Sequence, residues 1–207
     1  MSQQLKSLII FIVLVLIWGS AFILIKRGLE AYDAYQVSCV RVIAATAALA
    51  PFVIGKFKKV LQREWLYIIL SGFIGSLIPA VLFAYGMQNG IASSTAGVLS
   101  ALTPAFTLVI SWVAFKQRFS LVQILGLALG FVGAVSLLVT KSGKGIAFNN
   151  YGWFIVLATF LYALNLTLLK YRLKDTNPIL ITSFSLIFTL PITIGYLFTS
   201  DFIERFY

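Results

Sequence analysis

Long uncharged runs separated by short charged gaps form the main pattern of this chain. Each run is continuously apolar, whereas a strand of a membrane barrel alternates apolar and polar positions over about ten residues. A helix needs about 20 mostly apolar residues to cross a bilayer, so the runs predict spanning helices. We expect seven of them: Ser7–Ile25, Ala34–Ile54, Trp65–Met87, Ala92–Phe115, Phe119–Thr140, Tyr151–Leu169 and Pro178–Ser200.

Two features of the runs refine this prediction. The third and fourth spans belong to one uncharged run, Trp65–Phe115, which is too long for a single crossing. Gln88, Asn89 and Gly90 within it form a turn signal, and we divide the run there. Arg41 is the one charged residue inside any predicted span.

Composition supports a membrane protein and removes several functional classes. The chain is 60% hydrophobic and 11% charged, whereas soluble domains carry about 25% charged residues. It has no histidine, which removes the commonest general base and metal ligand. Its single cysteine, Cys39, cannot form an internal disulfide. We therefore expect an all-α polytopic helical bundle with no catalytic residue, no metal site and no cofactor.

The net charge of +10 is better explained by membrane topology than by a nucleic-acid partner. The Lys and Arg residues lie in the short gaps, where an excess marks the cytoplasmic side. With the N-terminus inside, ten of them fall in the cytoplasm and five outside. We predict a multi-pass protein of the inner or plasma membrane with a cytoplasmic N-terminus. The first run lacks a small-residue cleavage site and should remain as an uncleaved span.

The chain also contains a weak internal repeat. When it is shifted by 144 residues, the stretch WGSAFILIKRGL at 18–29 falls on residues 162–173 without a gap. The two stretches share an aromatic first residue and three identities. Asp33 and Asn177 then coincide as expected helix starts. The identity is low, and the value of the match is that the predicted helices coincide as well.

This repeat predicts an inverted architecture. Its period holds five predicted spans. Because five is odd, the second copy must enter the membrane from the opposite side, as in many transporters. We assign residues 1–143 to a five-helix repeat and 144–207 to the first two helices of a second. Two full copies would form ten helices, so we expect a truncated member of that design. The alternative is a complete seven-helix protein whose repeat is chance.

Several stretches resemble EamA-type members of the drug/metabolite transporter superfamily. WGSAFILIKRGL, followed by CVRVIAATAALAPF, is similar to the opening of such proteins. AYGMQNGIASSTAGVLSALTPAFTLVISWVAF at 84–115 resembles their third-to-fourth helix passage, and SLVQILGLALGFVGAVSLLV at 120–139 their glycine-spaced fifth helix. The resemblance covers nearly all of the chain. It implies a transporter that moves a small metabolite by alternating access, in the export direction.

The chain departs from the family pattern in two places. Family members usually carry a glutamate just after the fourth helix, whereas this chain has Gln117 between Lys116 and Arg118. The contact that this acid would make at the cytoplasmic end is therefore in doubt. The final three helices of the design are also missing, which makes a non-transporting remnant an alternative function.

Arg41 is the first candidate for solute binding, because a charge within a span is expensive unless it has a role. It could anchor an anionic or zwitterionic solute. The alternative is that its side chain reaches back to the headgroups near Asp33. No carboxylate lies inside any predicted span. A proton-coupled exporter of lipophilic cations, which the resemblance would link to a buried glutamate, is therefore disfavoured against neutral, zwitterionic or anionic metabolites.

The other candidates are polar, small or aromatic residues within the spans. Pro104 frees a carbonyl one turn earlier, and Ser100 and Thr103 beside it could line a path or a hinge. In an inverted pair the related first helices face each other at the solute site. This relation nominates Trp18, Ser20, Tyr162 and Asn165, with ordinary ring packing as the alternative. Tyr85 could contact the solute or anchor the membrane interface.

The glycine spacing of the fifth span has a structural interpretation. Gly126, Gly130 and Gly133 share one helical face, which predicts close packing against a neighbouring helix. We expect no solute contact from them.

Other functional classes fit less well. A membrane enzyme would need a nucleophile, a base or metal ligands, yet the chain has no histidine, no acidic pair within a span and no G-x-S-x-G motif. A seven-helix receptor would have the opposite orientation, and the seventh span has no lysine for a retinal Schiff base. The expected partners are a small-molecule solute and membrane lipid, and a homodimer that supplies the missing helices is left open.

Overall fold

The structure is a computed structural model that describes residues 3–56, 60, 62–142 and 149–206. These residues form helices and short helical turns, and none of them lies in a strand. This confirms the predicted all-α bundle. The α-helices are α1 (Gln3–Gly28), α2 (Ala34–Leu49), α3 (Trp65–Gly72), α4 (Ile78–Gln88), α5 (Ser93–Ser100), α6 (Leu102–Phe115), α7 (Leu121–Ser142), α8 (Gly152–Arg172), α9 (Pro178–Thr199) and α10 (Phe202–Phe206).

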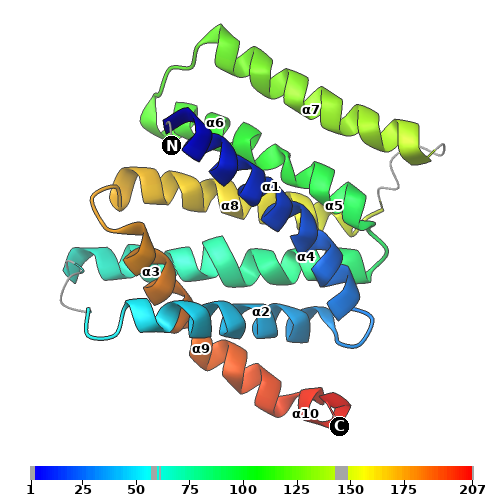
Figure 1. Ribbon diagram of the computed structural model, residues 1–207, viewed down its shortest axis with the longest axis vertical. Helices are drawn as coiled ribbons and strands as arrows, with labels where there is room; N and C mark the ends of the chain where they lie inside the picture. Colours follow the sequence, from blue (N-terminus) through cyan, green and yellow to red (C-terminus); the bar gives the residue numbers. More distant parts are fainter. Residues whose placement is uncertain (1–2, 57–59, 61, 143–148, 207) are drawn as a thin grey trace.

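The helices form a layered bundle with α8 and α4 near its middle. Figure 1 shows α7 at one edge and α9 with α10 at the opposite edge. Helix α8 packs against α4 and α6, while α2 packs against α9. The pair α2 and α9 thus joins the first part of the chain to the last.

Six helical segments among the described residues are long and apolar enough to cross a membrane. They correspond to the first four and the last two predicted spans. The predicted fifth span corresponds to α7, whose described apolar stretch, Leu121–Gly133, is shorter than a typical crossing. A crossing by α7 therefore stays a prediction.

Two of the spans are interrupted rather than continuous. The third consists of α3, a π-helical turn η4 (Phe73–Leu77) and α4, with Pro79 just after the turn. The fourth consists of α5 and α6, which meet at Ala101 just before Pro104. Proline lacks the N–H that would bond to the carbonyl four residues earlier, so both interruptions have a local cause.

The helix starts expected from the repeat are both capped. Asp33 begins α2, and its side chain accepts a hydrogen bond from the N–H of Gln36. Asn177 begins α9, and its side chain accepts one from the N–H of Ile179. These side chains satisfy backbone donors that a helix start leaves unpaired. The two residues that coincide under the 144-residue shift therefore have the same role.

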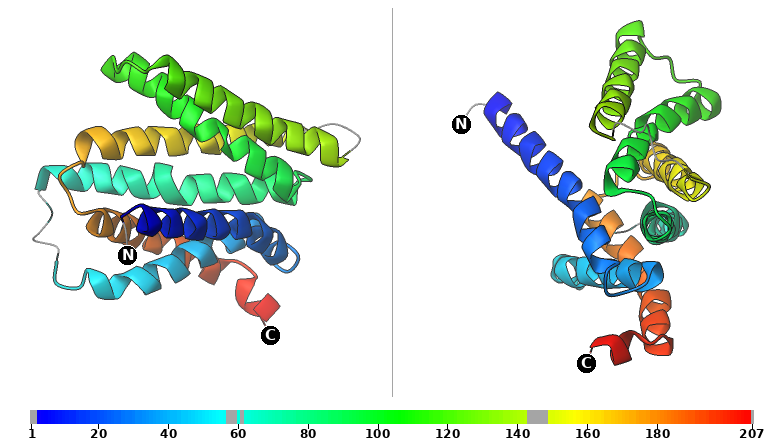
Figure 2. Two further views of the ribbon diagram at one scale, coloured as in Figure 1. Left: turned by 45° about the horizontal axis from the view of Figure 1, so that its top comes forward. Right: turned by 90° about the vertical axis from the view of Figure 1, so that its right-hand side faces the viewer.

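Helix α1 is held only by its second half. Ile25 is its one buried residue, and the apolar side chains from Leu8 to Trp18 are exposed. The right-hand view of Figure 2 shows the N-terminal part of α1 standing away from the other helices. Among the described residues, the C-terminal half of α1 packs mainly against α5 and α4.

Helix α7 is also sparsely packed. A Cβ atom added at Gly126, Gly130 or Gly133 would meet no described atom within 4 Å. The prediction of close packing at this glycine face is therefore wrong for the part of the chain that the structure describes.

Candidate functional site

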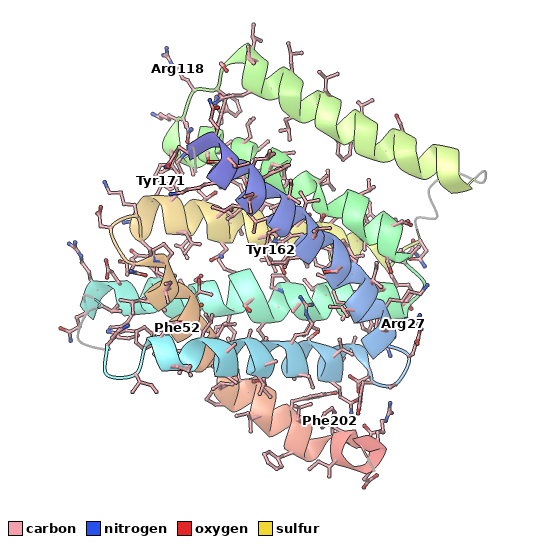
Figure 3. The ribbon with its side chains drawn as sticks, in the orientation of Figure 1. Arg27, Phe52, Arg118, Tyr162, Tyr171 and Phe202 are labelled. Atoms are coloured by element: carbon pink, nitrogen blue, oxygen red, sulfur yellow. The ribbon has the colours of Figure 1, made fainter. Side chains whose placement is uncertain are left out.

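A cavity of about 370 Å³ lies among the helices, between α1, α2 and α8 and the two interrupted spans. Its volume falls in the range of small-molecule sites. Figure 3 places Tyr162, one of its lining residues, in the middle of the bundle. The lining residues are Trp18, Ala21, Phe22, Ile25, Arg41, Gly75, Phe83, Ser100, Thr103, Tyr162, Asn165 and Leu166.

Most of the residues nominated from the sequence meet at this cavity. Six of the eight line it: Trp18, Arg41, Ser100, Thr103, Tyr162 and Asn165. They come from five different helices, α1, α2, α5, α6 and α8. The cavity thus brings together side chains that lie more than a hundred residues apart in the sequence.

The internal repeat coincides with the lining. The shift of 144 residues carries the α1 residues Trp18, Ala21 and Phe22 onto Tyr162, Asn165 and Leu166 of α8. All of these residues line the cavity. Corresponding positions of the two helices therefore contribute to the same space from two sides.

Arg41 supplies the positive charge at the cavity. It forms no hydrogen bond or ion pair with any residue in the described part of the chain. Asp33, the partner considered from the sequence, instead accepts the N–H of Gln36 at 2.8 Å. None of the lining residues is acidic. Among the described residues the guanidinium therefore has no counter-ion and is available to pair with an anionic group.

Asn165 lies directly against the π-helical turn. A Cβ atom at Gly75 would overlap the carboxamide of Asn165, so only glycine leaves room for this side chain. The turn is wide because the N–H of Ile78 bonds to the carbonyl of Phe73, five residues back. Such single π turns inside α-helices are frequent at functional sites.

The second interruption also reaches the cavity. Pro104 has no N–H for the carbonyl of Ser100, which would accept it in a regular helix. The hydroxyl of Ser100 donates to the carbonyl of Gly97, within its own helix. The hydroxyl proton of Ser100 is therefore engaged within its own helix, while the hydroxyl oxygen can still accept a hydrogen bond.

Aromatic side chains form one wall of the cavity. The rings of Phe22 and Phe83 lie 5.8 Å apart, and those of Phe83 and Tyr162 lie 6.0 Å apart. These spacings are typical of favourable aromatic pairs. Phe22, Phe83 and Gly75 were not nominated from the sequence. The nearest available signal was Pro79, because this proline follows the turn that contains Gly75.

Two nominated residues lie outside the lining. Ser20 is exposed, and its hydroxyl donates to the carbonyl of Ile17. Tyr85 joins an aromatic cluster near the end of α4, with its ring 5.1 Å from Phe154 and 5.9 Å from Tyr151. A solute contact by either residue stays a prediction, and the place of Tyr85 matches the alternative of an anchor near the end of a span.

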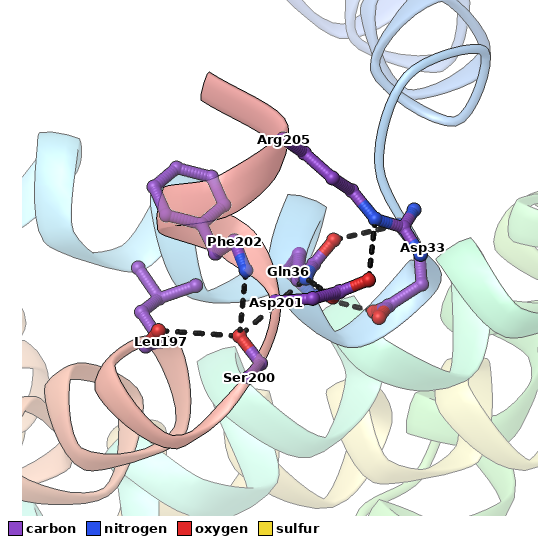
Figure 4. Close-up of polar contacts among 7 residues, drawn as sticks. All are labelled: Asp33, Gln36, Leu197, Ser200, Asp201, Phe202 and Arg205. Carbon is purple, nitrogen blue, oxygen red and sulfur yellow. Dashed lines mark hydrogen bonds and ion pairs between the residues drawn. The ribbon is translucent and has the colours of Figure 1, made fainter. Parts of the chain in front are cut away.

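Polar contacts connect the helices at the end of the bundle where α2 begins and α9 finishes, which we name the Asp201 end. The amide of Gln36 donates to Asp201 Oδ1 at 2.7 Å, and Arg205 Nε donates to Asp201 Oδ2 at 2.6 Å (Figure 4). These bonds, above all the one from Arg205, lower the pKa of the Asp201 carboxyl. Gln88 of α4 accepts from the N–H of Ala34 at 3.0 Å.

A second set of contacts lies where α6 and α8 finish, which we name the Lys170 end. Gln117 Oε1 accepts from Lys170 Nζ and from the hydroxyl of Tyr171, both at 2.7 Å. The ring of Tyr171 stacks on Phe115 with centroids 3.5 Å apart. The neutral amide of Gln117 thus accepts hydrogen bonds from a lysine and a tyrosine at the position where the resemblance led us to expect a glutamate. Lys116 reverses the chain before it with a φ of 52°.

A hollow of about 400 Å³ also lies at the Lys170 end, among loops rather than between spans. It is lined by both signs of charge, including Lys56, Glu64 and Asp175. Elsewhere, no group of three or more acidic or cysteine side chains in the described residues is placed to hold a metal ion. The cavity between the spans is therefore the better candidate for a solute site.

Comparison with known proteins identifies the family of this chain. Residues 5–139 match the EamA-like transporter family. The chain belongs to this family. It is a multi-pass membrane protein, and several of its relatives carry transporter or exporter names. No solved structure gives a significant match.

Individual relatives are distant. An uncharacterized transporter of Archaeoglobus fulgidus is 27% identical over 86% of this chain and 62% of its own length. A probable terminal-alkyne amino-acid exporter of Streptantibioticus cattleyicolor is 27% identical over 74% of this chain and 51% of its own. The inner membrane transporter YedA of Escherichia coli K12 is 28% identical over 70% and 46%. The chain thus spans about half the length of the curated relatives it matches.

Proposed function

We propose that this EamA-like chain moves a small neutral, zwitterionic or anionic metabolite across the membrane by alternating access, in the export direction. One observation carries this proposal. Six residues nominated from the sequence, drawn from both ends of the chain, line a single cavity between the spans. Transporters place their solute at such an interface between repeated halves.

The charge of the cavity supports the solute class. Arg41 is positive and has no counter-ion among the described residues, and no acid lines the space. A cationic solute would be repelled by the guanidinium, because no acid in the lining offsets this charge. A neutral, zwitterionic or anionic solute avoids this cost.

The two halves in this proposal are residues 1–143 and 144–207. Their inverted relation is supported by the caps at Asp33 and Asn177 and by the corresponding cavity residues of α1 and α8. The name of the Streptantibioticus relative, a probable amino-acid exporter, supports both the export direction and a small polar solute.

The proposed location is the plasma membrane, with the N-terminus in the cytoplasm. In this orientation the Lys170 end faces the cytoplasm and the Asp201 end the outside, which the excess of Lys and Arg in the cytoplasmic gaps supports. The inner membrane location in the name of the Escherichia coli relative supports this setting.

The proposal is tested by solute flux in vesicles that contain the purified chain. Arg41→Ala should abolish transport of an anionic or zwitterionic solute and leave membrane insertion intact. Arg27→Ala is the matched control, because Arg27 is exposed and pairs with Glu30 at 3.3 Å outside the cavity. Flux that is unchanged in Arg41→Ala would remove Arg41 from the site. The absence of flux for all solute classes in the unaltered chain would favour a non-transporting remnant.

A further inference from the structure

Three exposed cationic side chains gather around Gln117 at the Lys170 end of the bundle. Lys170 Nζ donates to Gln117 Oε1 at 2.7 Å, and Lys116 and Arg118 are the residues on either side of Gln117. Figure 3 shows Arg118 on the same side of the bundle as Tyr171, at the end of α8. We name these three cationic residues, Lys116, Arg118 and Lys170, the basic cluster.

The charge of the basic cluster is not offset within the part of the chain that the structure describes. None of its members forms an ion pair there, and only Lys170 forms a side-chain hydrogen bond. Glu64 and Asp175, the acids at this end, instead line the hollow beside α9. Gln117 is a neutral amide, so it positions the ammonium of Lys170 without cancelling its charge. A glutamate at the same place would cancel it.

An exposed apolar surface adjoins the basic cluster. Trp112 and Val113, on the last turn of α6, are mostly exposed, and so are Leu121 and Val122 at the start of α7. Bulky apolar side chains on the outside of a membrane bundle suit contact with lipid. Because α6 ends directly before Lys116, apolar surface and positive charge meet where this span leaves the membrane. A phospholipid with an anionic headgroup has the same division of apolar chains and opposite charge.

We propose that the basic cluster and the exposed end of α6 bind an anionic phospholipid, whose phosphate contacts the cluster while its acyl chains lie along Trp112 and Val113. Lysine and arginine residues at a membrane surface each raise the affinity for anionic lipid by about 5-fold. Gln117 acts as a positioning residue that keeps Lys170 beside the loop. None of these residues lines the cavity between the spans, so the lipid site does not depend on the proposed transport function.

The test uses two tryptophans of this chain as reporters. Trp112 lies one turn before the basic cluster and is 63% exposed, whereas Trp153, at the opposite end of α8, is 64% exposed. Each is kept as the single tryptophan of the full chain, with phenylalanine at the other three positions. The chain is placed in vesicles of phosphatidylcholine and phosphatidylglycerol, and bromine on the acyl chains of one lipid or the other quenches nearby fluorescence. We expect phosphatidylglycerol to be enriched at least about 5-fold at Trp112 and less than about 2-fold at Trp153.

Substitutions assign the enrichment to the basic cluster. Lys116→Gln combined with Arg118→Gln should reduce the enrichment at the α6 reporter to less than about 2-fold. Gln117→Glu keeps the acceptor for Lys170 and adds one negative charge, so it should lower the enrichment at least about 3-fold. Lys56→Gln is the matched control, because Lys56 lies at the same end of the bundle but in the hollow lined by acids. This control should leave the enrichment unchanged.

A second measurement uses the chain with all its tryptophans. In detergent, phosphatidylglycerol should raise its unfolding temperature more than phosphatidylcholine does, and Gln117→Glu should reduce this difference. Inorganic phosphate should weaken lipid binding no more than sodium chloride of equal ionic strength, since both screen the charge. Stronger displacement by phosphate would overturn the lipid site in favour of a free anion. Equal enrichment at both tryptophans, or an enrichment that Gln117→Glu leaves unchanged, would also overturn it.

Discussion

Helices α1 and α8 correspond under the 144-residue shift, yet they are held very differently. Helix α8 buries small residues on two faces, including Ala158, Thr159 and Ala163, and packs between α4 and α6. Helix α1 buries only Ile25 and carries a long run of exposed branched side chains. Small residues let helices approach closely in a membrane, whereas bulky apolar ones suit lipid. Equivalent positions of α8 and α1 therefore line one cavity, although α8 is tightly packed and α1 is loosely packed.

The largest expected difference in stability is between substitutions of Trp18 and Tyr162, the aromatic residues that correspond under the 144-residue shift. Tyr162 packs on Phe83 beside a buried core cluster, whereas Trp18 is 67% exposed. Tyr162→Ala should lower the free energy of unfolding by about 2–4 kcal/mol, and Trp18→Ala by less than about 1 kcal/mol. Denaturant unfolding in detergent measures both. Equal losses would show that α1 is packed as firmly as α8.

A glycine of α4 that faces α8 and a glycine within α1 provide the second comparison. A Cβ atom at Gly86 of α4 would lie 2.9 Å from Ile155 Cγ1 and 3.2 Å from the carbonyl of Tyr151, both on or beside α8. At Gly19 of α1 it would meet nothing within 4 Å. Gly86→Ala should therefore destabilise the protein by about 1–3 kcal/mol. Gly19→Ala should stabilise it by about 0.5–1 kcal/mol, because alanine favours a helix. If the unfolding temperature shifts in the same direction in both variants, the predicted difference in packing between α8 and α1 is wrong.

The C-terminal end of α8 is fixed by an amide, and its removal has a smaller effect. Gln117→Ala leaves Lys170 Nζ and the Tyr171 hydroxyl without their shared acceptor. We expect a loss of about 0.5–1.5 kcal/mol in unfolding free energy. Gln117→Glu keeps the acceptor and adds a charge, so its stability should stay within about 1 kcal/mol of the parent protein. A loss in the glutamate variant as large as in the alanine variant would show that the acceptor is not what matters.

The smallest expected effect concerns Asp201, which follows α9 and bonds to Gln36 of α2. Helices α2 and α9 pack against each other. The carboxyl of Asp201 has a lowered pKa because Arg205 and Gln36 bond to its charged form. Its contribution to stability is present above the ordinary value of 3.8 and is lost as the pH falls through the lowered folded value. Acid titration of unfolding to about pH 3 should therefore show a slightly steeper loss for the parent protein than for Asp201→Asn. Identical titration curves would remove Asp201 from the contact between α2 and α10.

The sequence predicted the helical class, the positions of six spans and six of the twelve residues that line the cavity. Continuous apolar runs determine helices in a membrane, and polar residues within them must face protein or water, so Arg41 and Asn165 could be found. Gly75, Phe22 and Phe83 could not be found in this way. Their role depends on which face each helix turns inward, and that follows from packing between distant segments. The sparse packing of α7 was unpredictable for the same reason, because a glycine face shows only that close packing is sterically allowed.

The π-helical turn η4 has a consequence for the register of the third span. Each residue of an α-helix advances its direction by about 100°, so one extra residue in a turn rotates everything that follows. Phe83 on α4 reaches the cavity, whereas Ile68 on α3 packs in a different core cluster at the Lys170 end. Deletion of a single residue within Phe73–Leu77 would turn the later side chains of α4 away from their present neighbours. The length of this one turn, counted in residues, therefore sets which side of α4 lines the cavity.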